Sequence, residues 1–224
     1  TRREEWRQLV AGLQQEFPGA IPTEGDPLSH YGLINAVAAC VDDNAIITTD
    51  VGQHQMWTAQ AYPLNRPRQW LTSGGLGTMG FGLPAAMGAK FGAPDRTVCF
   101  FTGDGGMQMT IQELGTIMQE KLDVKIIILN NNFLGMVRQW QELFYKERYS
   151  ATSMENPDFV AIASAYRIAA RQVEKREELD DAIHEMLSHD GPYLLVAEVE
   201  ERGMVYPMVP AGGCVTNIIM GDNQ

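Results

Sequence analysis

Four short runs of apolar residues constrain the fold of this chain more than any other feature. They occupy residues 45–49, 98–102, 125–129 and 193–199. Strands that are apolar on both faces belong to parallel sheets covered by helices. Segments with helical spacing of apolar residues alternate with these runs, at residues 29–41, 84–90, 110–121, 134–145, 158–166 and 177–188. We therefore predict an α/β fold, a parallel sheet with helices on both faces.

The 224 residues suffice for one sizeable domain, which we place at residues 29–200. The first sixteen residues have helical spacing, and prolines make residues 17–27 an irregular connector. We interpret residues 1–28 as a linker from a preceding domain and residues 201–224 as a C-terminal tail. The chain begins with neither a methionine nor a signal peptide, so we expect its start to be a cut inside a longer polypeptide.

Charge and cysteine content narrow the function classes. A net charge of −11 argues against a nucleic-acid-binding surface, which needs clustered Lys and Arg. No apolar run approaches the roughly 18 residues of a membrane span. Cys40, Cys99 and Cys214 are far apart, and the first two lie in apolar segments. We expect those two to be buried, reduced thiols in a cytoplasmic protein.

Three loops follow the first three apolar runs, at residues 50–55, 103–109 and 130–136. In open parallel sheets, ligands bind beyond the carboxyl ends of the strands. These loops are therefore the predicted ligand-binding region. The sequence Thr110-Ile111-Gln112-Glu113 after the second loop is typical of a capping box, so we expect a helix to begin there.

The second and third loops together indicate a metal and diphosphate site. Gly103-Asp104-Gly105-Gly106 would let backbone N–H groups approach a phosphate. Asn131 follows 27 positions after Asp104 (131 minus 104), with one helix between, which brings two strand ends together. Their oxygens, a backbone carbonyl just beyond and two diphosphate oxygens would suit Mg²⁺. Either motif alone is equally well explained as a turn or a loop; the pair favours the site.

The spacing resembles the signature of thiamine-diphosphate enzymes. Between Gly105 of Gly-Asp-Gly and Asn130 of Asn-Asn lie 24 residues (106 to 129). Four longer strings are similar to the catalytic subunit of acetohydroxyacid synthase (acetolactate synthase), and they lie at residues 50–57, 73–86, 134–141 and 206–210. The resemblance extends from about residue 32 to residue 210.

The resemblance implies roles for individual residues. Asp104 and Asn131 would hold Mg²⁺ by their side chains and Phe133 by its backbone carbonyl. Met79 would push between the two rings of thiamine diphosphate and hold it bent. Met136 and Trp140 would lie at the substrate pocket, although a plain helix-face cluster also explains them. The implied cofactor-binding set is Val51, Gly52, Gln53, His54, Gly77, Met79, Gly103, Asp104, Gly105, Gly106, Asn131, Phe133, Leu134, Gly135, Met136 and Val137.

The resemblance also implies an activity and partners. The reaction would condense pyruvate with a second 2-ketoacid, pyruvate or 2-ketobutyrate, with loss of CO₂, in branched-chain amino-acid biosynthesis. The glutamate that activates the cofactor would lie on an N-terminal domain of a partner subunit, and FAD on a middle domain, so this chain carries no catalytic residue of its own. A homodimer, a regulatory small subunit and an inactive isolated chain are expected. The alternatives are a related decarboxylase, carboligase or pyruvate oxidase, or a non-catalytic cofactor-binding or assembly domain.

Two other motifs are weaker. Residues 75–80 satisfy G-x-G-x-x-G, and Asp95 follows at the distance that a dinucleotide fingerprint requires. However, Asp95 lies in an expected turn, so we give the nicotinamide interpretation little weight. His184 and His189 are one residue too far apart for H-E-x-x-H, which indicates a surface helix.

Overall fold

One sheet of six parallel strands organises the computed structural model, which describes residues 1–16 and 28–221. Its order is β2-β1-β3-β4-β6-β5. The strands are β1 (Ile46–Thr49), β2 (Trp70–Leu71), β3 (Val98–Gly103), β4 (Val124–Asn130), β5 (Ala169–Val173) and β6 (Tyr193–Glu198). All five pairings are parallel, so every strand ends at the same edge of the sheet. The predicted parallel α/β fold is confirmed.

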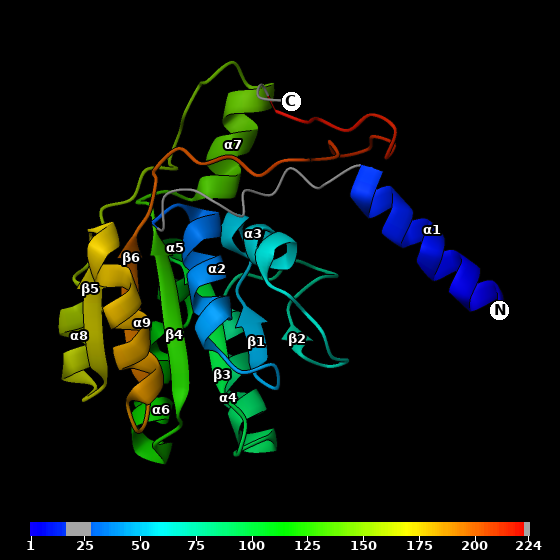
Figure 1. The fold of residues 1–224 in the computed structure, drawn as a ribbon. Helices are drawn as coiled ribbons and strands as arrows, with labels where there is room; N and C mark the ends of the chain where they lie inside the picture. The colour runs from blue at the N-terminus through cyan, green and yellow to red at the C-terminus, as the bar shows by residue number, and fades with distance from the viewer. Residues whose placement is uncertain (17–27, 222–224) are drawn as a thin grey trace. The chain divides into compact units, whose positions relative to one another are not determined.

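Helices cover both faces of this sheet, as predicted (Figure 1). One face packs against α2 (His30–Cys40), α3 (Gln53–Ala61) and α9 (Leu179–Ser188). The other packs against α4 (Gly82–Gly92), α6 (Leu114–Glu120) and α8 (Phe159–Ala165). Further helical segments are α1 (Arg2–Glu16), α5 (Asp104–Met109), α7 (Gly135–Phe144) and the 3₁₀ turns η1 (Ile111–Glu113) and η2 (Arg176–Glu178).

Alternation along the strands divides the core in two. Ile47, Cys99 and Ile127 face the α2, α3 and α9 layer. Ile46, Val98 and the other strand residues that alternate with these face the opposite layer. Because successive side chains of a strand point to opposite faces, a strand that is apolar throughout fills both layers.

The chain divides into two units. One comprises residues 23–205 and contains the whole sheet. The other comprises residues 1–22 and 206–224, with α1 and a bridge between Met208 and Ile219. The predicted connector at residues 17–27 lies outside the described residues. No helix among the described residues is long and apolar enough to cross a membrane.

Several local predictions were wrong. The sheet also contains β2 and β5, which the apolar runs did not reveal. Thr110 forms no capping box, because its backbone (φ −136°, ψ 29°) is not extended and its hydroxyl donates to the Gly80 carbonyl at 3.3 Å. Helix α6 therefore begins only after η1. Cys40 is exposed at the end of α2, although Cys99 is buried as expected.

Candidate functional site

A cleft lies where β1, β3 and β4 end. Every residue of the predicted cofactor-binding set except Gly77 lines it, together with Trp57 and Leu129. These residues come from three separate stretches and from Met79. The register explains the convergence, since Gly103 pairs with Leu129 and the two chain segments leave the sheet side by side.

Three helices begin at this cleft; the third was predicted at residues 134–145, whereas the first two begin where loops were predicted. They start at Gln53, Asp104 and Gly135. The first turn of a helix leaves N–H groups without intrahelical acceptors and carries partial positive charge. In α7 the first backbone bond runs from Arg138 N to Leu134 O (3.0 Å), so the N–H groups of residues 135–137 have no acceptor within the helix. No Lys or Arg is among the described lining residues. This lining therefore suits an anion that binds together with a metal cation.

Close backbone packing narrows the cleft at two glycines. A Cβ atom at Gly103 would lie 3.0 Å from Nδ1 of His54. A Cβ atom at Gly135 would collide with the side chain of Gln53 and lie 3.2 Å from Nδ2 of Asn131. Larger residues at either position would displace the side chains that line the cleft.

Asp104 and Asn131 supply oxygens to the same cleft. The Asp104 carboxylate is 1% exposed and accepts hydrogen bonds from Gly105 N (3.0 Å) and Asn156 Nδ2 (2.6 Å). Burial raises its pKa, and the hydrogen bond from Asn156 opposes that shift. Asn131 Oδ1 accepts from Phe133 N at 3.2 Å. A carboxylate, an amide oxygen and a nearby carbonyl form the oxygen set that Mg²⁺ prefers.

The protein alone offers an incomplete metal shell. Among the described residues, no group of three or more His, Cys, Asp or Glu side chains could hold a metal ion. Mg²⁺ commonly completes its shell with water and phosphate oxygens. The donors at the cleft therefore fit a metal ion that arrives with a diphosphate.

Two buried polar atoms at the cleft also indicate a ligand. Gln53 donates from Nε2 to Gln139 Oε1 (2.8 Å) and to the Gly203 carbonyl (2.9 Å), but its Oε1 has no partner among the described residues. His54 Nε2 is also buried without a partner there. Burial lowers the pKa of His54 to about 4, so its imidazole is neutral at pH 7. Buried polar atoms normally have partners, so both atoms are available to a bound molecule.

Met79 reaches the cleft from a turn that Asp50 holds in place. The Asp50 carboxylate is fully buried and accepts from Val51 N (2.6 Å) and from Gly80 N (2.9 and 3.0 Å). Gly77 lies outside the lining and has φ +62°; a Cβ atom there would lie 3.7 Å from Val51 Cγ1. The sequence interpretation gave Asp50 no role, because its partner Gly80 lies 30 positions away.

Trp140 lies apart from the cleft. Its side chain is 43% exposed and contacts Phe144 edge to face, with ring centroids 6.2 Å apart. Trp140 lines a separate pocket that shares Val137 with the cleft. Met136 lines the cleft itself. The substrate roles of Met136 and Trp140 stay predictions.

Asn156 is a second residue that the sequence interpretation missed. Its amide nitrogen lies within hydrogen-bonding distance of oxygens from Asp104, Asn130 and Asn132. Asp104 and Asn156 are 52 positions apart. Asn156 lies just before α8, and no spacing rule connects it to the Gly-Asp-Gly motif.

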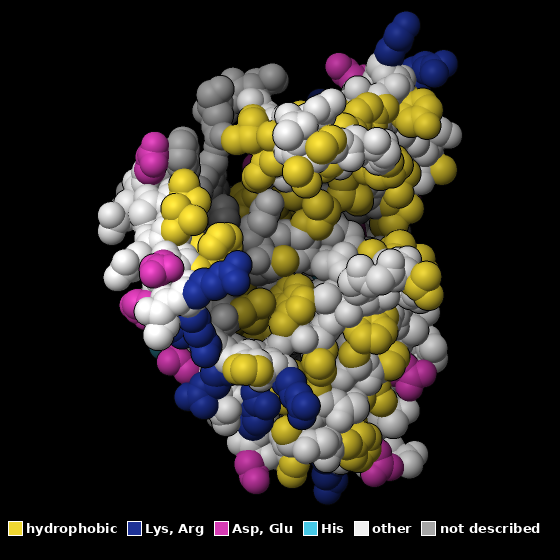
Figure 2. All heavy atoms as spheres, turned by 90° about the vertical axis from the view of Figure 1, so that its right-hand side faces the viewer, with side chains coloured by type: hydrophobic (Ala, Val, Ile, Leu, Met, Phe, Trp, Pro, Cys, Tyr) yellow, Lys and Arg dark blue, Asp and Glu magenta, His cyan; other side chains and the backbone are white. Residues whose placement is uncertain are grey.

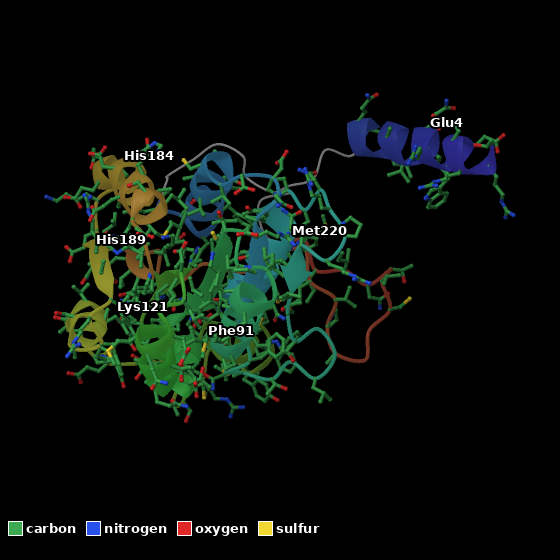
Figure 3. All side chains as sticks on the ribbon, turned by 90° about the horizontal axis from the view of Figure 1, so that it is seen from below. Glu4, Phe91, Lys121, His184, His189 and Met220 are labelled. Atoms are coloured by element: carbon green, nitrogen blue, oxygen red, sulfur yellow. The ribbon has the colours of Figure 1, made fainter. Side chains whose placement is uncertain are left out.

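The weaker motifs fall away from the cleft. Asp95 is exposed and precedes β3, whereas the acidic residue of a dinucleotide fingerprint follows a strand. His184 and His189 are exposed on α9 and at its end, on the outer side of the domain (Figure 3). Neither motif forms a site.

Comparison with known proteins agrees with this geometry. Residues 50–197 match the family described as "Thiamine pyrophosphate enzyme, C-terminal TPP binding domain". Among solved structures, a thiamine diphosphate-dependent 4-hydroxybenzoylformate decarboxylase from Rhodococcus jostii RHA1 superposes with a TM-score of 0.73 at 28% identity, over 81% of this chain and 34% of that one.

Curated relatives are more similar in sequence. The large subunit of acetolactate synthase isozyme 1 from Escherichia coli (strain K12) is 56% identical over 97% of this chain and 39% of its own length. The isozyme 2 large subunit of the same organism is 44% identical over 93% and 38%. A chloroplastic acetolactate synthase of Nicotiana tabacum is 45% identical over 98% and 34%. The chain thus spans less than half the length of these relatives. By the family match and the cleft together, the chain belongs to the thiamine pyrophosphate enzymes and comprises their C-terminal TPP binding domain.

Proposed function

We propose that this chain is the cofactor-binding part of an acetolactate synthase large subunit. The whole enzyme would condense pyruvate with pyruvate or 2-ketobutyrate and release CO₂, as a step of branched-chain amino-acid biosynthesis. Identity of 56% to the isozyme 1 large subunit over nearly the whole chain supports this assignment. The observation that carries the proposal is the cleft at the strand ends, with its metal-type oxygens and three helix N-termini.

In this proposal the chain binds and orients thiamine diphosphate through Mg²⁺. Asp104, Asn131 and the Phe133 carbonyl hold the metal, and the starts of α3, α5 and α7 face the diphosphate. The bound cofactor supplies the electron sink for decarboxylation and carbon–carbon bond formation. The protein excludes water and fixes geometry.

The ring end of the cofactor would lie against Met79. The two oxygens of Asp50 hold Gly80, and this fixes the turn that carries Met79 toward the cleft. Backbone groups of Gly77 and Met79 would meet the aminopyrimidine. Met136 and Trp140 would line the 2-ketoacid pocket, Met136 from the cleft and Trp140 from the adjoining pocket that shares Val137.

Other parts of the active site would come from elsewhere in the enzyme. We propose that an activating glutamate lies on an N-terminal domain of a partner subunit, that FAD lies on a middle domain, and that a homodimer with a regulatory small subunit assembles in the cytoplasm. Residues 1–28 would join this domain to the preceding one. Exposed apolar side chains support the proposal that other parts of the enzyme cover this surface. Leu76 is 94% exposed, and Phe81 and Val137 are also exposed. Figure 2 colours apolar side chains yellow, and several of them are exposed in the view that it draws.

Calorimetry tests whether Asp104 holds the metal ion and, through it, the cofactor. The 224-residue chain is titrated with thiamine diphosphate in the presence of Mg²⁺, beside Asp104→Ala and the control Asp95→Ala at an exposed position. We expect binding by the wild type and the control and none by Asp104→Ala, because that variant lacks the carboxylate that holds the metal. Equal heats for all three proteins would refute the proposed role of Asp104 in metal and cofactor binding.

Product analysis tests the reaction. The isolated chain should form no acetolactate from pyruvate, because the activating glutamate is elsewhere; turnover well above background would contradict this. The full-length protein, given pyruvate and 2-ketobutyrate, should yield acetolactate or acetohydroxybutyrate. Acetaldehyde or acetyl phosphate as the main product would instead favour a decarboxylase or a pyruvate oxidase.

A further inference from the structure

Asn156 connects the metal-type carboxylate of the cleft to a second polar cluster. Its Nδ2 lies 2.6 Å from Asp104 Oδ2, 2.8 Å from Asn130 Oδ1 and 3.0 Å from Asn132 Oδ1. An amide nitrogen has two hydrogens. The two shortest contacts are therefore direct hydrogen bonds, and the contact to Asn132 shares a hydrogen with one of them.

The hydrogen bonds at Glu198 determine which atoms of Asn130 and Asn156 act as donors. The carboxylate of Glu198 only accepts when ionised, and Asn130 Nδ2 donates to both of its oxygens, at 2.7 and 2.9 Å. Asn130 must therefore turn its Oδ1 toward Asn156, which in turn must present its NH₂ group. Gln108 Nε2 donates to Asn156 Oδ1 at 2.9 Å and fixes the same orientation independently.

The result is a carboxylate that cannot rotate. Asp104 Oδ1 accepts from Gly105 N and Oδ2 accepts from Asn156, so both oxygens are held while their remaining lone pairs stay available. Asn156 itself does not line the cleft. It lines a separate pocket, with Glu198 and Gln172. Asn156 can therefore act on a bound ion only through its hydrogen-bonded partners, and Asp104 is the one among them that is a proposed metal ligand.

We propose that Asn156 is a positioning residue that locks the Asp104 carboxylate into the orientation required by Mg²⁺. This inference rests on the proposed function, because it assumes that Asp104 is a metal ligand. Mg²⁺ requires near-ideal octahedral geometry at about 2.1 Å, whereas Ca²⁺ accepts longer and more variable bonds. A locked carboxylate favours Mg²⁺, and a carboxylate released from Asn156 discriminates less between the two ions.

The experiment measures both metals on the full 224-residue chain. Thiamine diphosphate binding is titrated by calorimetry as a function of Mg²⁺ and, separately, of Ca²⁺. The variants are Asn156→Leu, similar in size without a donor, and Asn156→Asp, similar in shape but only an acceptor. Asn65→Leu and Asn65→Asp, at an exposed asparagine, are the matched controls. Circular dichroism and thermal melting verify folding.

We expect Asn156→Leu to lower the Mg²⁺ affinity about 10- to 100-fold, as loss of an outer-shell partner does. The Ca²⁺ affinity should fall less, so the ratio of the two affinities decreases. Asn156→Asp should also weaken Mg²⁺ binding, although simple charge attraction would strengthen it. This second variant decides the matter if Asn156→Leu does not fold.

Two results would overturn the inference. In one, both Asn156 variants bind Mg²⁺ as the wild type does, or Asn156→Asp binds it more tightly. In the other, the Mg²⁺ and Ca²⁺ affinities fall by the same factor, as a merely structural role predicts. A wild-type chain that binds neither metal with the cofactor would instead overturn the proposed function, and the inference with it.

Discussion

Two glycines of helix α4 provide the sharpest test of the packing beside the cleft. Gly82 begins this helix against the end of β1. A Cβ atom there would lie 2.5 Å from Asp50 N and 2.7 Å from the Thr49 carbonyl carbon, and it would overlap the Phe100 ring. A Cβ atom at Gly88, in the same helix, would meet nothing within 4 Å. The same substitution by alanine should therefore have opposite effects at the two positions.

The expected magnitudes follow from these contacts. Carbon contacts are optimal at about 3.5 Å or more, so Gly82→Ala must push α4 away from β1 by roughly 1 Å. Overpacking of this kind costs about 1–3 kcal/mol, and weakening a hydrogen bond to the Asp50 carboxylate costs about 1.5–3 kcal/mol more. Gly88→Ala should instead increase the free energy of unfolding by about 0.5–1 kcal/mol, because alanine loses less backbone entropy in a helix.

Thermal and urea unfolding, followed by circular dichroism, measure both variants. For a chain of this size about 1 kcal/mol corresponds to roughly 2–4 °C in Tm. Gly82→Ala should therefore lower Tm by about 6 °C or more, and Gly88→Ala should raise it by about 1–4 °C. Unchanged stability of Gly82→Ala, or a shift of the same sign for both variants, would refute the packing argument.

Two further predictions concern buried ionisable groups. Burial lowers the pKa of His54 to about 4 and that of His30 to about 3. In the unfolded state both pKa values are near 6.5, so the unfolded state binds more protons below that pH. The free energy of unfolding should therefore be highest above pH 6.5 and fall as the pH drops toward 4. Urea unfolding at pH 7 and pH 5 checks this, and a higher stability at pH 5 would contradict it. Asp50→Asn should lower the free energy of unfolding by about 2 kcal/mol, because an NH₂ group would face a backbone N–H of Val51 or Gly80. Hydrogen exchange at Gly80 should also accelerate relative to the exposed control Asp95→Asn; equal exchange in the two variants would show that Asp50 does not hold this turn.

The sequence predicted the elements whose signal is local. Each apolar run became a strand, and α2 forms within the predicted segment 29–41, where Ser29 caps it through a hydrogen bond from Gly32 N. Strand β2 has only two residues, too few for any pattern. Strand β5 is an edge strand with a polar centre, Arg171-Gln172, so it lacks an apolar run. Helix α3 was missed because the side chains it buries include Gln53 and His54, which read as loop residues.

The site was predictable where the chain itself carries the spacing. The Gly-Asp-Gly and Asn-Asn motifs end neighbouring strands, and one short crossover fixes their proximity. Asp50 and Asn156 depend on partners 30 and 52 positions away, whose proximity only the folded sheet creates. Each of these interactions joins a carboxylate to a donor that is distant in the sequence. A single sequence does not indicate which donors will lie near a carboxylate in the fold.

Under the proposed function, the charge balance of the cleft makes the metal ion and the diphosphate depend on each other for binding. Asp104 is the one acidic side chain among the described residues that line it, and no Lys or Arg lies beside it there. A diphosphate alone would be repelled by that carboxylate, and a divalent cation alone would find a single negative charge. Each ligand therefore raises the affinity for the other, and by the same factor, because binding free energies are linked reciprocally. Under the proposed function, the cleft would therefore be filled only where the metal ion and the cofactor are both available.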